Sequence, residues 1–150
     1  MTTSTDQAIW TAFLRLQAVV ERQLAEALQR CHGMRLSEYR ALRDLSQAAD
    51  SELRMKVLAD RIGLDQSSVT RLVGRLDALG FVYRDLCADD RRGVHAVVTE
   101  AGRERYLLAS ETYSDVLTCA LDTLDADPQF GSLVRALRTA RPSNGESRPG

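Results

Sequence analysis

The chain has 150 residues, of which 44% are hydrophobic and 27% charged, and its net charge at pH 7 is −1. This length allows one domain with a core, or a small domain with additional arms, and the composition excludes a disordered chain except at its ends. The near-zero net charge argues weakly against nucleic-acid binding, but the sum hides the distribution of charge, and every basic side chain except Lys56 and the two histidines is an arginine.

The first predicted element is a helix over residues 6–31, where apolar residues recur every three or four positions. Further apolar residues widen this face beyond a single stripe. A helix of about 25 residues is long for such a chain, and so broad a face indicates burial against both its own domain and a second subunit. Gly33 ends the helix. The stripe and its flanks consist of Ile9, Trp10, Phe13, Leu14, Leu16, Val19, Val20, Leu24 and Leu28.

A second helix and a short third helix are predicted next. Ser37 is a candidate N-cap for the second helix. The polar stretch 50–56 connects the two helices and is expected to hold a short strand at 54–56. The short third helix covers residues 57–62 and is closed by Gly63.

A fourth helix is predicted over residues 67–79. Several capping side chains stand in a row at 65–68 before it, and Gly80 after it suits a left-handed C-terminal residue. Its inward face is expected to hold Val69, Leu72, Val73, Leu76 and Leu79.

After residue 80 the pattern of apolar residues is no longer helical, and the sequence predicts a β-hairpin. Runs rich in β-branched and aromatic residues at 81–87 and 94–99 flank the polar turn 88–93. Thr99 then caps a long helix that extends to about Leu124. A last helix is expected to open at Pro128, which follows the capping residue Asp127.

This order predicts a mainly α fold with a small β-wing, namely a winged helix-turn-helix with long N- and C-terminal dimerisation helices. We expect one domain over residues 1–150. Its winged-helix lobe covers about 36–99, its dimerisation helices cover 6–33 and 100–140, and its flexible tail covers 141–150.

The outward face of the fourth helix carries small hydroxyls at its first turn and then two arginines one turn apart. A helix N-terminus with short side chains can approach phosphates and base edges, and arginine can reach guanine. An ordinary solvated helix face explains this pattern equally well. Gly74 either permits close approach to DNA or is a tolerated replacement. The face consists of Ser67, Thr70, Arg71, Gly74, Arg75 and Ala78.

The hairpin adds basic residues at a useful place. Arg84 lies on its first strand, and Arg91 and Arg92 lie at its tip, where arginine suits a narrow minor groove. The neighbouring Asp89 and Asp90 can hold a guanidinium group or the turn backbone through charge-assisted hydrogen bonds. A solvated hairpin without a partner is the alternative.

Together these segments resemble the MarR family of winged-helix regulators. The resemblance rests on residues 57–73 (VLADRIGLDQSSVTRLV), 76–82 and 90–93 (DRRG), each at the expected spacing from the next. Residues 98–103 (VTEAGR) are similar to the family's opening of the long fifth helix. The flanking helices agree with the family only in length, order and apolarity.

The resemblance implies a homodimer, joined by its first and last two helices, that binds a pseudo-palindromic operator in double-stranded DNA. Each subunit would place the fourth helix in the major groove and the wing in the adjacent minor groove. Asp90 would orient the wing, Arg54 is a further phosphate contact, and Gly74 departs from the polar residue common at its place. The expected DNA-binding residues are Lys56, Ser67, Ser68, Thr70, Arg71, Arg75, Arg84, Arg91 and Arg92.

Members of this family often bind a small phenolic or lipophilic effector between the dimerisation helices and the DNA-binding lobe. The resemblance therefore implies a repressor that such an effector releases. The alternative for the aromatic residues near this crevice is plain core packing. The candidate pocket residues are Trp10, Phe13, Leu14, His32, Tyr39 and Tyr113.

The three cysteines, Cys31, Cys87 and Cys119, stand too far apart for a disulfide framework or a cysteine-only zinc site. We expect them to be buried and inert, and we expect no metal and no cofactor. The cysteine that a hydroperoxide-sensing branch of the family carries early in its first helix is absent at residues 10–13. Redox sensing through Cys87 in the wing is an alternative.

The polar N-terminus lacks an apolar signal core, and no run approaches the ~20 apolar residues of a membrane span, so we expect a cytoplasmic protein. No nucleophile–base pair, phosphate-binding loop or carboxylate pair is legible, so catalysis is not expected. A protein-interaction module with a winged-helix fold is the remaining alternative, motivated by the acidic wing residues.

Overall fold

The computed structural model describes residues 4–86 and 93–141. The chain forms two compact units, Leu24–Asp115 and a second one that combines Met1–Gln23 with Val116–Gly150. The expected wing tip and, apart from Arg141, the expected flexible tail at 141–150 lie outside the described residues.

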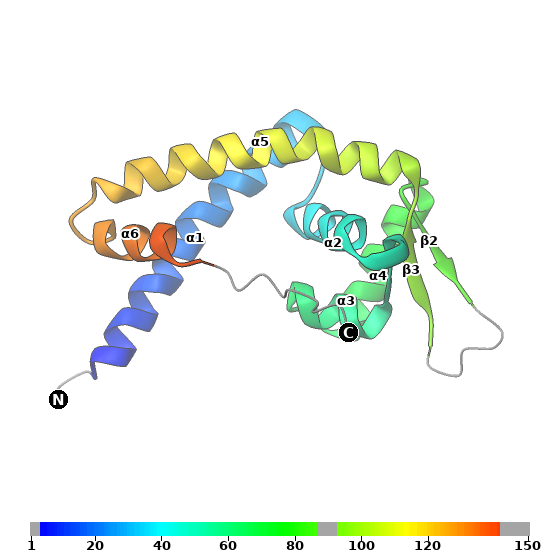
Figure 1. The fold of residues 1–150 in the computed structure, drawn as a ribbon, viewed down its shortest axis with the longest axis horizontal. Helices are drawn as coiled ribbons and strands as arrows, with labels where there is room; N and C mark the ends of the chain where they lie inside the picture. The colour runs from blue at the N-terminus through cyan, green and yellow to red at the C-terminus, as the bar shows by residue number, and fades with distance from the viewer. Residues whose placement is uncertain (1–3, 87–92, 142–150) are drawn as a thin grey trace, which may run out of the picture. The chain divides into compact units, whose positions relative to one another are not determined.

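The order of elements confirms a mainly α fold with a small β-wing (Figure 1). The long first helix and the long fifth helix each contribute to both units. The elements are α1 (Thr5–His32), α2 (Leu36–Gln47), the short 3-10 helix η1 (Ala49–Ser51), β1 (Glu52–Arg54), α3 (Met55–Ile62), α4 (Gln66–Ala78), β2 (Val82–Asp85), β3 (His95–Val98), α5 (Glu100–Asp125) and α6 (Gly131–Thr139).

The three strands form one antiparallel sheet in the order β1-β3-β2. In the hairpin, Val82 pairs with Val98, and on the other side of β3, Arg54 pairs with His95. The short strand predicted at 54–56 therefore lies earlier, at Glu52–Arg54, and α3 begins at Met55. The reason is tertiary, because β3 supplies the backbone partners that so short a strand needs.

The core of the Leu24–Asp115 unit gathers around the inward face of α4. Four of its five predicted inward residues are buried, whereas Leu79 was predicted inward and is 59% exposed. Leu79 occupies the C-cap of α4, where Gly80 turns the chain away with a φ of 79°. The fully or nearly fully buried leucines and valines of this core are Leu28, Leu42, Leu45, Leu58, Val69, Leu72, Val73, Leu76 and Val82.

The start of α2 differs from the prediction. The helix begins at Leu36, and Arg35 holds the N-cap position without a side-chain hydrogen bond. Ser37 therefore lies inside the first turn and caps nothing. A serine can cap a helix only when it lies just before the first helical residue. Here the chain turns at Gly33, which has a φ of 60°, and α2 begins at Leu36, one residue before Ser37.

The start of α6 also differs. It begins at Gly131 with Phe130 at the N-cap, not at Pro128. The Asp127 side chain accepts a hydrogen bond from the Gln129 backbone N–H at 2.7 Å. This local turn uses the carboxylate that was expected to cap a helix, which delays the helix by three residues.

The second unit packs α6 against the last part of α5 and the first part of α1. Its buried apolar residues are Leu16, Val20, Ala120, Leu124, Phe130 and Val134. Two ion pairs join α6 to α5, Arg135 with Asp125 at 3.1 Å and Arg138 with Asp122 at 2.7 Å. Within residues 4–86 and 93–141, no helix has both the length and the apolar character that crossing a membrane would require.

The junction between the hairpin and α5 confirms the predicted cap. The Thr99 hydroxyl donates to the Gly80 carbonyl oxygen at 2.7 Å and accepts from the Gly102 N–H at 3.0 Å. The Thr99 N–H donates to the Phe81 carbonyl oxygen at 3.0 Å. One threonine therefore caps α5 and ties it to the turn that ends α4.

Candidate nucleic-acid interface

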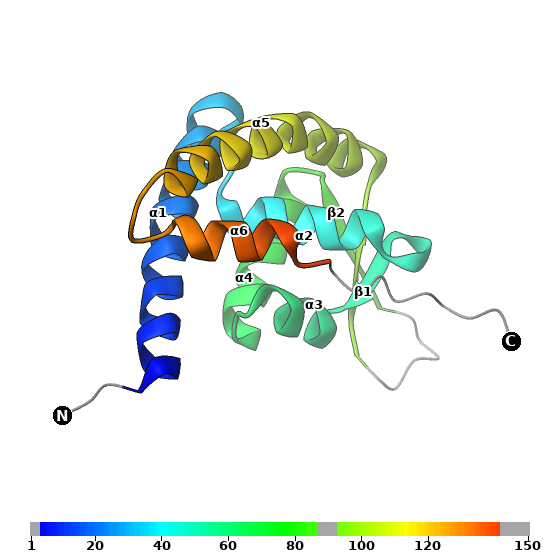
Figure 2. The ribbon, with the colours of Figure 1, turned by 60° about the vertical axis from the view of Figure 1, so that its left-hand side comes forward.

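The helix-turn-helix consists of α3, a three-residue turn and α4, and the two helices lie side by side across that turn (Figure 2). Gly63 adopts a φ of 76°, and the N–H groups of Gly63 and Leu64 both donate to the Ala59 carbonyl oxygen. This closure ends α3 as predicted. Asp65 then places the N-terminus of α4 at the surface.

The N-terminus of α4 is capped by Asp65. Its carboxylate accepts from the Ser68 N–H at 2.7 Å and from the Ser67 hydroxyl at 2.9 Å. These hydrogen bonds lower the pKa of Asp65 below its ordinary value, and the bond from the Ser68 N–H has the largest effect. The predicted row of capping residues at 65–68 is therefore confirmed, with Asp65 as the residue that performs the capping.

The outward face of α4 carries the polar side chains that the sequence indicated. Ser67, Thr70 and Arg71 are exposed, and the Arg71 guanidinium lies 3.4 Å from the Ser68 hydroxyl. Arg75 differs, because it is half-buried and its Nε is shielded from solvent without a hydrogen-bond partner. Arg71 is thus the freer of the two arginines to reach a ligand in front of α4.

A shallow hollow of about 280 Å³ lies between α4 and the hairpin. Arg84 on β2 lines it, and its Nη2 lies 3.6 Å from Asp77 Oδ2 on α4. The sequence did not single out Asp77. Its one distinguishing feature is that it is acidic on a side of α4 that otherwise carries basic residues. The other residues that line the hollow are Met55, Gln66, Thr70, Gly93 and Val94.

The remaining predicted contact residues have different outcomes. Lys56 is exposed in the first turn of α3, and Arg54 is half-buried at the end of β1. The expected wing-tip residues Asp90, Arg91 and Arg92 lie outside the described residues. Among the described residues, the candidate interface therefore consists of α4 with the flanking Lys56 and Arg84.

The six predicted effector residues fall into two groups, one in each compact unit. In the Leu24–Asp115 unit, the rings of Tyr39 and Tyr113 stack at 4.4 Å, and His32 Nε2 shares a hydrogen bond of 2.7 Å with the Thr112 hydroxyl. In the other unit, the exposed Trp10 stacks on Phe13 at 5.6 Å, and Leu14 is also exposed.

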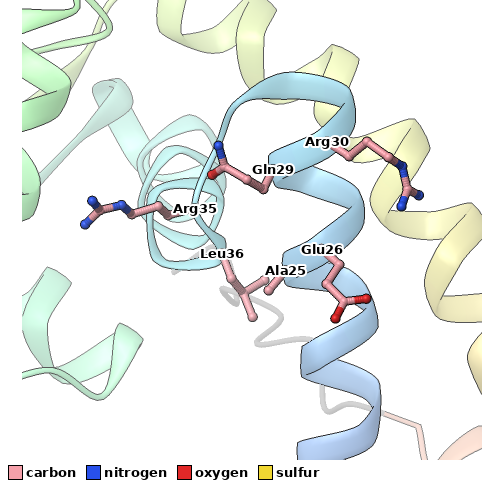
Figure 3. A pocket seen from close by; sticks show the side chains of 6 residues that line it. All are labelled: Ala25, Glu26, Gln29, Arg30, Arg35 and Leu36. Atoms are coloured by element: carbon pink, nitrogen blue, oxygen red, sulfur yellow. The ribbon is translucent and has the colours of Figure 1, made fainter.

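The same Leu24–Asp115 unit has a cavity of about 520 Å³ that is lined by none of these predicted residues. It is open and lies between the end of α1 and the start of α2 (Figure 3). Figure 3 shows Leu36 beside Ala25, whereas the guanidinium groups of Arg30 and Arg35 point away to opposite sides.

The packing of Tyr39 against Tyr113 can be tested through the pKa of Tyr39. Burial, aided by Tyr106 and Tyr113, raises the pKa of Tyr39 from 10.0 to about 12. A tyrosine whose folded pKa is raised contributes stability that is present below pH 10 and is lost as the pH rises towards 12. We expect Tyr39→Phe to lose less stability than wild type over this range in alkaline unfolding followed by circular dichroism. Tyr83→Phe, at a residue that is 49% exposed, is the control, and parallel losses in wild type and Tyr39→Phe would contradict the assignment.

The cysteines correct one expectation. Cys31 and Cys119 are exposed, because they lie on the solvent sides of α1 and α5, so the prediction that they are buried was wrong. Cys87, the predicted redox candidate, lies outside the described residues. In the part of the chain that the structure describes, no three His, Cys, Asp or Glu side chains gather as metal ligands would.

Comparison with known proteins agrees with this geometry. Residues 32–93 match the model of the MarR family. The solved structure of AbsC, a MarR family transcriptional regulator from Streptomyces coelicolor, is 28% identical, with a TM-score of 0.74 over 92% of this chain and 93% of that chain. Sco3205, a MarR family transcriptional regulator from the same organism solved in complex with DNA, is 27% identical, with a TM-score of 0.74 over 98% and 95%.

A third solved structure, NadR in complex with 4-hydroxyphenylacetate, is 20% identical, with a TM-score of 0.68 over 94% of this chain and 99% of that chain, and it shares the fold. No curated protein matches the sequence. The winged-helix segment at residues 32–93 therefore belongs to the MarR family, and nearly the whole chain shares its fold with MarR family transcriptional regulators.

Proposed function

We propose that the protein is a dimeric, sequence-specific DNA-binding regulator. The observation that carries the proposal is the outward face of α4, where exposed Ser67, Thr70 and Arg71 follow a capped helix N-terminus. A helix N-terminus attracts phosphate, and an arginine beyond it can reach the O6 and N7 atoms of guanine. The DNA complex of Sco3205 supports the same partner for this chain.

In this proposal α4 enters the major groove and the hairpin enters the adjacent minor groove. Lys56 and Arg84 then face phosphates beside the two grooves, and Arg92 reaches into the minor groove from a wing that Asp90 orients. Arg75 is proposed as a phosphate contact rather than a base contact, because its side chain is half-buried. The other proposed contacts are Ser67, Ser68, Thr70, Arg71 and Arg91.

The second unit supports a homodimer. Ile9, Trp10 and Leu14 on α1 are 52%, 61% and 46% exposed, and Leu137 on α6 is 44% exposed. An apolar hollow of about 280 Å³ adjoins Leu137, and its lining includes Phe13. Apolar surface of this extent costs free energy in water, and a second copy of the same helices would cover it.

The proposal also makes the protein a repressor that a small aromatic or lipophilic effector releases. In this chain Tyr39 is 3% exposed and its ring stacks on that of Tyr113 within the core of the Leu24–Asp115 unit, so the support for an effector comes from a protein that shares this fold. The 4-hydroxyphenylacetate complex of NadR illustrates a ligand of this class in a protein with this fold.

Selection of bound duplexes from a random pool tests the proposal. We expect an enriched pseudo-palindromic sequence, and we expect its binding to weaken by about 10³-fold between 50 and 200 mM salt, because a dimer neutralises six or more phosphates. Addition of phenolic compounds during selection tests for an effector. Affinity that does not change with salt, or a pool without enrichment, would contradict the proposal and favour a protein-interaction module.

A further inference from the structure

Three residues lie along the side of α4 that is next to the hairpin, and one of them, Thr70, also borders the outward face. Gln66, Thr70 and Asp77 follow spacings of four and seven residues, which place them along one side of an α-helix. Arg84 on β2 lines a hollow that Gln66 and Thr70 also line, and its guanidinium group approaches Asp77. The side of α4 towards the wing is therefore a polar surface centred on one guanidinium group.

The partners at this surface are both accessible. The side chain of Arg84 is 45% exposed and that of Asp77 is 39% exposed, with 3.6 Å between Nη2 and Oδ2. An ion pair this exposed contributes little to folding stability, because water screens the charges and both side chains must be ordered. A protein that lacks this ion pair should therefore still fold. The main effect of Asp77 is instead on the binding of charged groups to Arg84.

The inference rests on the proposed function. A helix in the major groove and a wing in the adjacent minor groove lie on either side of one sugar–phosphate strand. The surface between α4 and β2 then faces phosphates, so Arg84 attracts them and Asp77 repels them. The pair has no net charge, which removes one attraction that would act on every duplex regardless of sequence.

We propose that Asp77 is a specificity-determining residue that restrains Arg84 and so weakens binding to unrelated DNA. On the correct operator, the carboxylate also holds the guanidinium in one orientation, and this positioning offsets its repulsion of the phosphate. On an unrelated duplex the phosphate is not in the matching position, so only the repulsion acts. Asp77 thereby widens the difference in affinity between operator and unrelated DNA.

The experiment measures the dissociation constants of wild type and Asp77→Asn for the selected operator and for an unrelated duplex of equal length, over a range of salt concentrations. We expect Asp77→Asn to bind unrelated DNA about 5- to 10-fold more tightly, with a salt slope steeper by about 1 for each subunit, and to bind the operator within about 2-fold of wild type. Arg84→Gln in the Asp77→Asn background should abolish the gain on unrelated DNA.

Asp125→Asn is the matched control. It makes the same charge change in another exposed Asp–Arg pair, in which Asp125 is 38% exposed and lies 3.1 Å from Arg135. Thermal unfolding establishes that each variant is folded. An operator-to-unrelated ratio that stays at the wild-type value in Asp77→Asn, or an equal shift on both duplexes, would overturn the role of Asp77 while leaving DNA binding intact. A wild-type protein that binds no duplex would instead overturn the proposed function.

Discussion

Gly102→Ala is expected to lower the free energy of unfolding by about 3 kcal/mol, the upper end of the usual cost of forcing atoms into a packed site. A Cβ at this position would run into the Phe81 carbonyl oxygen and would lie 2.9 Å from both the Phe81 carbonyl carbon and a Val98 methyl group. The obstacle is backbone, and the Phe81 carbonyl already accepts the Thr99 N–H, so it cannot move without breaking the hydrogen bond that ties the start of α5 to the turn after α4. Chemical denaturation followed by circular dichroism measures the loss.

Gly74→Ala is the matched control for this substitution. Gly74 also lies in a helix, but a Cβ there would meet nothing within 4 Å. Alanine favours the helix over glycine, so we expect Gly74→Ala to raise the free energy of unfolding by about 0.5–1 kcal/mol. A Gly102→Ala protein as stable as wild type would show that the junction of hairpin and α5 relaxes freely, contrary to the close approach described above.

Arg71→Ala is expected to weaken binding to the selected operator by about 10- to 100-fold and to relax the base preference at one position of each half-site. Arg71 is exposed on the outward face of α4, next to the Ser68 hydroxyl, so its truncation removes the proposed base contact without opening the core. Repeating the DNA selection with the variant, together with affinity measurements on single-base changes, measures both effects.

Two further arginine variants define the role of Arg71. Arg92→Ala is expected to weaken binding to all duplexes to a similar extent, without a change of preferred sequence. The reason is that an arginine in the minor groove is attracted by the negative potential of the groove and the backbone rather than by particular bases. Arg30→Ala, at an exposed position on α1, should leave both properties unchanged. If Arg71→Ala retains wild-type affinity and preference, base reading lies elsewhere on α4.

The spacing of apolar residues was sufficient to predict the architecture, because most features of the winged-helix lobe depend on residues that are close together in the chain. The buried residues of α4 follow a regular three- and four-residue spacing, and Gly63 and Gly80 end their helices with the positive φ that their sequence positions indicated. Thr99 caps α5 as expected. Each of these signals involves residues close together in the chain, where helical geometry alone decides which side chains meet.

The sequence by itself therefore determined the element order, the position and capped start of α4, and the match to the MarR family at residues 32–93. Only the tertiary structure decided what depends on distant partners. The strand β1 exists because β3 pairs with it, Arg75 is half-buried by its surroundings, and Arg84 faces Asp77 because β2 folds back beside α4. Such contacts join residues whose separation along the chain carries no periodic signal, so the pair formed by Asp77 and Arg84 was visible only in three dimensions.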